Sequence, residues 1–71
     1  MKYRYTYNFR TIDKHIIELY NTIGDRVEEV DALYEVYSRG YMIGINRLTD
    51  ELTLINMANV IRVKVRIEEL P

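Results

Sequence analysis

The sequence predicts a small α+β domain, one unit over residues 1–71, with an N-terminal strand, one or two helices and a C-terminal antiparallel β-meander. Residues 2–10 alternate between aromatic and polar side chains, and residues 60–67 alternate between aliphatic and basic ones. Between these strands, apolar residues recur at helical spacing. A chain of 71 residues is long enough for one domain only. Such a chain hides about 60% of its unfolded surface, so a partner subunit would help to stabilise it.

The opening segment shows the clearest strand pattern in the chain. Its aromatic side chains share one face, and its basic and polar side chains share the other. The first face holds Tyr3, Tyr5, Tyr7 and Phe9, and the second holds Lys2, Arg4, Thr6, Asn8 and Arg10. Period two predicts a half-buried strand whose aromatic row faces a core or a subunit interface.

From Thr11 onward the spacing changes and predicts a helix near residues 12–23. Its apolar stripe is Ile12, Ile16, Leu19, Tyr20 and Ile23. Thr11 is placed to act as the N-cap and Gly24 to end the helix. On this helix Lys14 and Glu18 would form an ion pair at four residues' spacing.

Residues 25–39 fit two interpretations. A helix is favoured by Asp25 as N-cap with Glu28 three residues later, and by Gly40 as a stop. Its apolar stripe would be Val27, Val30, Tyr34 and Tyr37. The alternative is a hairpin, because residues 33–37 and 41–43 are rich in strand-forming side chains and Arg39-Gly40 can form the turn.

The last thirty residues are typical of antiparallel strands. We expect strands at 41–46, 52–56 and 60–67, with a polar connection at 47–51 and a break at 57–59. In the last strand, aliphatic residues alternate with Arg62, Lys64 and Arg66, so one face belongs to the core and the other to solvent. The N-terminal strand can pair with this meander, and helices can cover its apolar face.

Composition excludes several classes of chemistry. The absence of cysteine removes disulfides, thiolate zinc sites and thiol nucleophiles, and favours a cytoplasmic location. The sequence shows no signal-peptide pattern and no apolar run long enough for a membrane span. Net charge is −1, with an acidic middle between a basic start and a balanced end.

Catalysis and metal binding find little support in the pattern. The single histidine, His15, and the single serine, Ser38, lie far apart and outside any nucleophile motif. His15, Glu18 and Asp13 fall short of a catalytic zinc site, which usually needs more than one histidine. The carboxylates at 28–35 suit a solvated face, and the isolated glycines form no phosphate-binding loop. We therefore expect a protein that is not an enzyme and uses no cofactor.

Basic residues form the first candidate surface. Arg4 and Arg10 on the first strand, with Arg62, Lys64 and Arg66 on the last, could contact nucleic acid or an acidic partner. Stacking of bases on the tyrosines of the first strand is disfavoured, because these tyrosines and the basic residues lie on opposite faces. The alternative function is a small nucleic-acid-binding regulator that uses the aromatic and basic N-terminal strand and the basic C-terminal strand.

Tyrosines form the second candidate surface. Seven tyrosines exceed what a core this small can hold, and tyrosine is enriched at protein interfaces. Tyr34, Tyr37 and Tyr41 share one side if residues 25–39 are helical. They predict a homodimer contact or a partner-binding surface.

The segment Leu54 to Val63, LINMANVIRV, resembles the tails of short orphan proteins of phages and prophages of low-GC Gram-positive bacteria. The likeness is confined to this tail and carries over no functional residue. It implies a mobile-element origin and a role in binding and modulating a host protein. The leading hypothesis is thus a small inhibitor or adaptor that binds a host factor; a structural subunit of a larger assembly is a third possibility.

Overall fold

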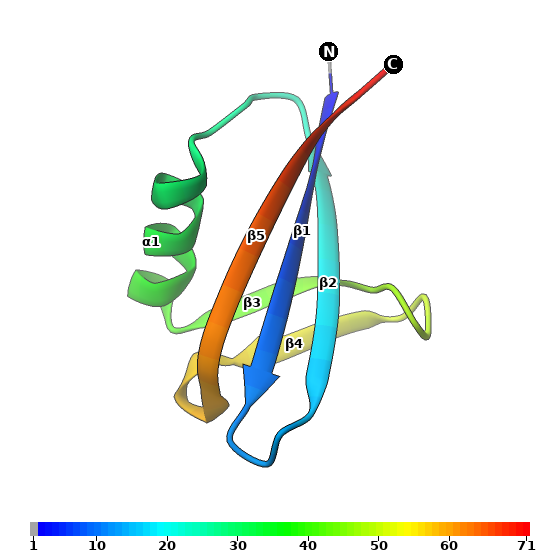
Figure 1. Cartoon of the computed structure of the whole chain (residues 1–71). Coiled ribbons are helices and arrows are strands. Elements are labelled where there is room, and N and C mark those ends of the chain that lie inside the picture. The colour runs from blue at the N-terminus through cyan, green and yellow to red at the C-terminus, as the bar shows by residue number, and fades with distance from the viewer. Residues whose placement is uncertain (1) are drawn as a thin grey trace.

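The computed structural model describes residues 2–71, which form five antiparallel strands and one α-helix. The α+β class is confirmed. In chain order the elements are β1 (Lys2–Thr11), β2 (Ile16–Ile23), α1 (Glu29–Arg39), β3 (Tyr41–Asn46), β4 (Leu52–Asn56), the 3₁₀ turn η1 (Met57–Asn59) and β5 (Val60–Leu70). All strands belong to one sheet in the order β4-β3-β2-β1-β5 (Figure 1).

The helix predicted over residues 12–23 is wrong, because residues 16–23 form β2 and pair with β1 as a hairpin. The four residues between the strands turn the chain, with Lys14 at φ 69° and the His15 N–H donating to the Thr11 hydroxyl at 3.1 Å. β-Branched and aromatic side chains dominate β2 and suit a strand. Thr11 and Gly24 therefore cap no helix, and Glu18 accepts a hydrogen bond from Asn8 of β1 in place of the expected Lys14 pair.

The helix favoured for residues 25–39 is confirmed in its second part, as α1. It begins after Glu28, whose side chain makes no capping bond, so the predicted Asp25 cap is wrong. Gly40 ends the helix at φ 86° and donates its N–H to the Val36 carbonyl at 3.0 Å, which excludes the hairpin turn. Within residues 2–71, no helix is long and apolar enough to cross a membrane.

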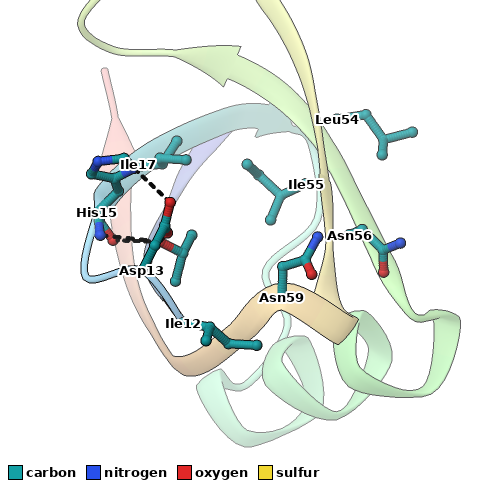
Figure 2. A pocket seen from close by; sticks show the side chains of 9 residues that line it. Ile12, Asp13, His15, Ile17, Leu54, Ile55, Asn56 and Asn59 are labelled. Atoms are coloured by element: carbon teal, nitrogen blue, oxygen red, sulfur yellow. Dashed lines mark hydrogen bonds and ion pairs between the residues drawn. The ribbon is translucent and has the colours of Figure 1, made fainter.

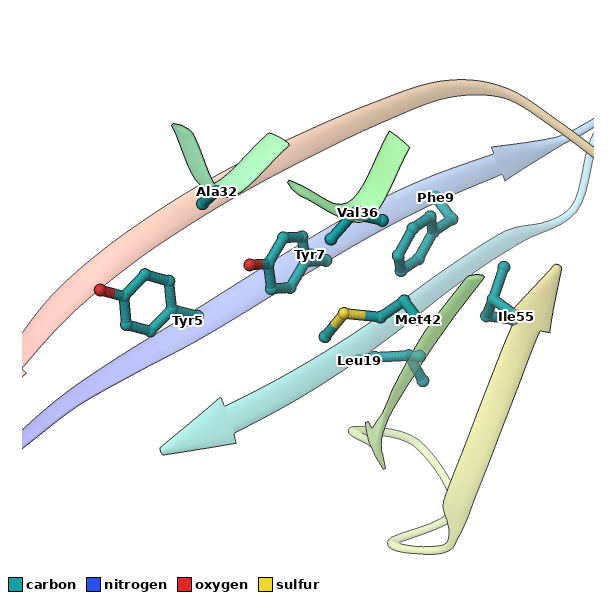
Figure 3. Close-up of a cluster of buried hydrophobic side chains, with 8 residues drawn as sticks. All are labelled: Tyr5, Tyr7, Phe9, Leu19, Ala32, Val36, Met42 and Ile55. Carbon is teal, nitrogen blue, oxygen red and sulfur yellow. The ribbon is translucent and has the colours of Figure 1, made fainter. Parts of the chain in front are cut away.

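The core lies between the inner face of the sheet and α1 (Figure 3). The aromatic row of β1 faces this core as predicted, and Phe9 is fully buried together with Leu19 of β2. The buried hydrophobic side chains are Tyr5, Tyr7, Phe9, Leu19, Ala32, Val36, Met42 and Ile55. They come from β1, β2, α1, β3 and β4, and β1 contributes three of the eight, so one core joins the sheet to the helix.

The sheet bends sharply between β2 and β3. These strands pair at only two positions, Leu19 with Asn46 and Tyr20 with Ile45. The β3–β4 hairpin therefore crosses behind β1 and β2 at a steep angle (Figure 1). Gly44 permits the crossing, because a Cβ there would lie 3.1 Å from the Leu19 Cβ and from the Tyr20 carbonyl oxygen.

The C-terminal strands form where the sequence predicts them. β3 and β4 pair with each other, the break at 57–59 is η1, and β5 crosses to the far side of β1. The β1–β5 ladder runs nearly the whole length of both strands, from Lys2 opposite Leu70 to Thr11 opposite Val60. The start of β1 and the end of β5 therefore lie side by side (Figure 1).

Candidate binding surfaces

The β1–β5 register gathers the five predicted basic residues on one surface. Arg10 lies opposite Arg62, Asn8 opposite Lys64 and Thr6 opposite Arg66. These side chains alternate with the buried aromatic row, so they point away from the core. We call this surface the basic face and define it by Arg4, Arg10, Arg62, Lys64 and Arg66.

Cations on the basic face have few anionic partners. The Arg66 Nε lies 3.7 Å from the Glu68 carboxylate, and the Arg4 guanidinium lies 5.1 Å from the centre of the Tyr20 ring. Within residues 2–71, Arg10, Arg62 and Lys64 form no ion pair. Their positive potential is therefore directed into solvent.

A shallow depression of about 420 Å³ lies on the basic face. Thr6 of β1 lines it and is only 3% exposed, and the Thr6 Oγ1 has no hydrogen-bond partner among residues 2–71. Lys64 and Arg66 line the β5 side, and Glu18 lines the β2 side. A buried hydroxyl without a partner is unfavourable by about 1–3 kcal/mol, so this donor would gain from a ligand oxygen.

The tyrosines of β1 pack into or against the core. The Tyr5 hydroxyl donates to the Asp25 carbonyl at 3.0 Å and accepts from the Val27 N–H at 2.5 Å, which ties the β2–α1 connection to the sheet. Burial, and next the nearby Glu35 carboxylate, raise the pKa of Tyr7 above its ordinary value. As expected from their separation, these rings and the basic residues lie on opposite faces, so they form no common stacking platform.

A stripe of large apolar side chains runs along the outside of α1. Val30, Tyr34 and Tyr37 are 70%, 72% and 75% exposed, whereas Ala32 and Val36 are buried. Their spacing of four and three residues places them on one side of the helix. We call Val30, Tyr34 and Tyr37 the outer helix stripe.

Tyr41, predicted to accompany Tyr34 and Tyr37, is the first residue of β3. It alternates with the buried Met42, so it points to the outer face of that strand. The Arg39 guanidinium lies 5.7 Å from the centre of its ring. Tyr41 is exposed, but it belongs to a strand rather than to the helix stripe.

An exposed apolar surface on β3 and β4 was not predicted from the sequence. The β3–β4 register pairs Ile43 with Leu54 and Ile45 with Leu52, and Ile43, Leu52 and Leu54 are exposed. Alternation with the buried Met42 and Ile55 was the signal that could have found it.

The cleft in Figure 2, about 540 Å³, lies between the β1–β2 turn and β4. His15 Nδ1 lies 3.2 Å from an Asp13 carboxylate oxygen, and both side chains are exposed. The Thr11 hydroxyl donates to Asp13 rather than to the imidazole, so the three groups lack the order of an activated nucleophile. The Thr11 bond, more than His15, lowers the pKa of Asp13. Residues 2–71 contain no cluster of three potential metal ligands.

Comparison with known proteins adds no family to this description. The chain matches no protein-family model, no curated protein and no solved structure. The basic face and the outer helix stripe therefore carry the functional argument.

Proposed function

We propose that this chain is a non-enzymatic protein-binding module and that the outer helix stripe docks into an apolar groove of its partner. The observation that carries the proposal is the exposure of Val30, Tyr34 and Tyr37 on the side of α1 opposite the core. An amphipathic helix presenting anchors at this spacing is a recurring mode of protein recognition. Tyrosine suits such an anchor because it buries a large area and keeps a polar end.

Charge next to the stripe indicates the partner's chemistry. The first turn of α1 carries Glu29 and Asp31, and Asp31 forms no ion pair within residues 2–71. An apolar groove with basic side chains on its rim would complement this surface.

The resemblance of the C-terminal tail adds the kind of target. Phage and prophage proteins with such tails imply a host protein as partner, in the cytoplasm, and an inhibitor or adaptor as the role. The β-sheet then serves as the scaffold that holds α1, since Tyr5 anchors the connection that leads into it.

Photo-crosslinking tests the proposal. A photo-reactive amino acid replaces Tyr37 and, as the matched control, the exposed Leu48 of the β3–β4 loop. In bacterial lysate at high salt and after nuclease treatment, the probe at Tyr37 should give one discrete protein adduct. Tyr34→Ser should abolish this adduct, while the thermal unfolding of that variant stays unchanged because the side chain is exposed.

Two results would contradict the proposal. Equal adducts from the probes at Tyr37 and Leu48 would mean that the stripe is not the interface. An adduct that persists in Tyr34→Ser would mean the same. An adduct with the mass of two chains, together with a dimer in sedimentation velocity, would identify the second copy as the occupant of the stripe in place of a host protein.

A further inference from the structure

We propose that the basic face binds the phosphate backbone of a single-stranded nucleic acid, with one phosphate seated over Thr6. This site lies on the sheet and is independent of the outer helix stripe. It is carried by three features: a cross-strand row of cations, the scarcity of anionic partners for them, and a buried hydroxyl that faces the same surface.

The cation row is placed by strand pairing. Arg62, Lys64 and Arg66 follow one another at every second residue of β5, which spaces them roughly 7 Å apart. That spacing is comparable with the separation of successive phosphates along one nucleic-acid strand. Arg10 extends the row sideways, because it lies directly opposite Arg62. Like charges placed opposite each other destabilise a sheet, so an anion between them would relieve their repulsion.

Thr6 provides the specific contact in the row. Its Oγ1 is buried, lines the depression and has no partner among residues 2–71. A phosphate oxygen can accept a hydrogen bond from this hydroxyl while Lys64 and Arg66 neutralise its charge. Glu18 lies on the β2 side of the depression, where its carboxylate accepts a hydrogen bond from the Asn8 amide at 3.2 Å and would repel an anion. The anion is therefore expected on the β5 side of β1.

The shape of the face favours a single strand over a duplex. The basic face lies on two neighbouring strands of a five-stranded sheet, β1 and β5, and no helix of residues 2–71 projects from it to enter a groove. Tyr20 lies on the same face, opposite Thr6 in the β1–β2 ladder, and offers one half-buried ring beside Arg4. With the tyrosines of β1 turned into the core, contacts to the backbone dominate and sequence preference should be small.

Fluorescence anisotropy with a labelled oligothymidylate tests the site. Binding should weaken steeply as salt rises, with a slope of log K on log [salt] of about −2 to −3 for three or four contacted phosphates. Lys64→Ala should weaken binding roughly fivefold at low salt and make the slope shallower by about 0.7. Arg26→Ala is the matched control, because Arg26 is paired with Glu28 and Glu29 near α1, and it should leave binding unchanged.

Thr6→Val separates the seated phosphate from general attraction. Valine keeps the shape of threonine and removes the unpartnered hydroxyl, so the fold should remain as stable as the parent. Affinity should nevertheless fall roughly threefold with the salt slope unchanged, since a hydrogen bond is lost and no charge is.

Several outcomes would overturn the inference. One is the absence of binding by the folded protein at low salt, and another is equal weakening by Lys64→Ala and Arg26→Ala. A duplex of the same length, or poly-glutamate, bound as tightly as the oligothymidylate would replace the single strand with a general polyanion. Because the outer helix stripe is intact in every variant used, these results are independent of the crosslinking experiment.

Discussion

Arg10 and Arg62 lie directly opposite each other in the β1–β5 ladder, and neither has an anionic partner within residues 2–71. A like-charge cross-strand pair opposes folding by roughly 0.2–1 kcal/mol. The sheet would therefore be more stable if one of these two arginines were replaced by a neutral residue. The pair therefore links the stability of the fold to the proposed anion site.

Arg62→Gln is expected to raise the free energy of unfolding by a few tenths of a kcal/mol, because it removes this repulsion. Urea denaturation at low ionic strength measures the gain, and added salt should shrink it by screening. Arg47→Gln, a loop cation, is the control and should have no effect. The same Arg62→Gln should weaken oligothymidylate binding. A variant that is both less stable and a weaker binder would show that Arg62 is needed for the fold instead.

Tyr5→Phe is expected to lower the free energy of unfolding by about 1–3 kcal/mol. The substitution leaves the Val27 N–H without its acceptor and the Asp25 carbonyl without its donor in a partly buried connection. Hydrogen exchange of the Val27 amide should accelerate in parallel. Tyr37→Phe removes an exposed hydroxyl and should change neither quantity; equal behaviour of the two variants would contradict the role of Tyr5.

Gly44→Ala is expected to destabilise the protein by about 1–3 kcal/mol through overpacking. The added Cβ would lie 3.1 Å from the Leu19 Cβ and from the Tyr20 carbonyl oxygen, and the backbone cannot give way without loosening the β2–β3 crossing. Gly24→Ala is the matched control, since a Cβ there meets nothing within 4 Å. Thermal unfolding should separate the two; a neutral Gly44→Ala would mean that the crossing is slack.

The raised pKa of Tyr7 predicts how the free energy of unfolding changes at high pH. Burial raises its pKa in the folded state above the ordinary value of 10.0, so above that pH the unfolded chain binds fewer protons than the native one. Its contribution is therefore fully present below the unfolded pKa and is lost as the pH rises through the folded pKa. Urea unfolding from about pH 8 to about pH 11 should show a fall that is smaller in Tyr7→Phe. Identical pH profiles for parent and variant would assign the fall to other groups.

Local patterns predicted a strand correctly wherever the apolar residues fitted the two-residue period of a strand and not the helical period. Residues 2–10 alternate without exception, and β1 runs from Lys2 to Thr11. Residues 16–23 were assigned wrongly because adjacent isoleucines satisfy both a helical stripe and a two-residue alternation. The β1 strand resolved this ambiguity by supplying a partner for the backbone of β2, which a sequence pattern does not reveal.

The outer helix stripe shows the same limit. Val30, Tyr34 and Tyr37 correctly indicated a helix, but the core packs against the side with Ala32 and Val36. An apolar stripe marks a helix face without stating what covers it. In the folded protein Ala32 and Val36 face the core, and the Tyr5 hydroxyl holds the connection that precedes α1.

By itself, the sequence determined the α+β class, the alternation of β1 and β5 and the exclusion of thiol chemistry. It also determined that each basic row would point to the solvent side of its own strand. Only the tertiary structure decided that β5 pairs with β1, which places Arg10 beside Arg62 and Lys64 beside Thr6's depression. The reason is physical: alternation is a property of neighbouring residues, whereas pairing joins segments about fifty residues apart and is settled by the packing of the whole core.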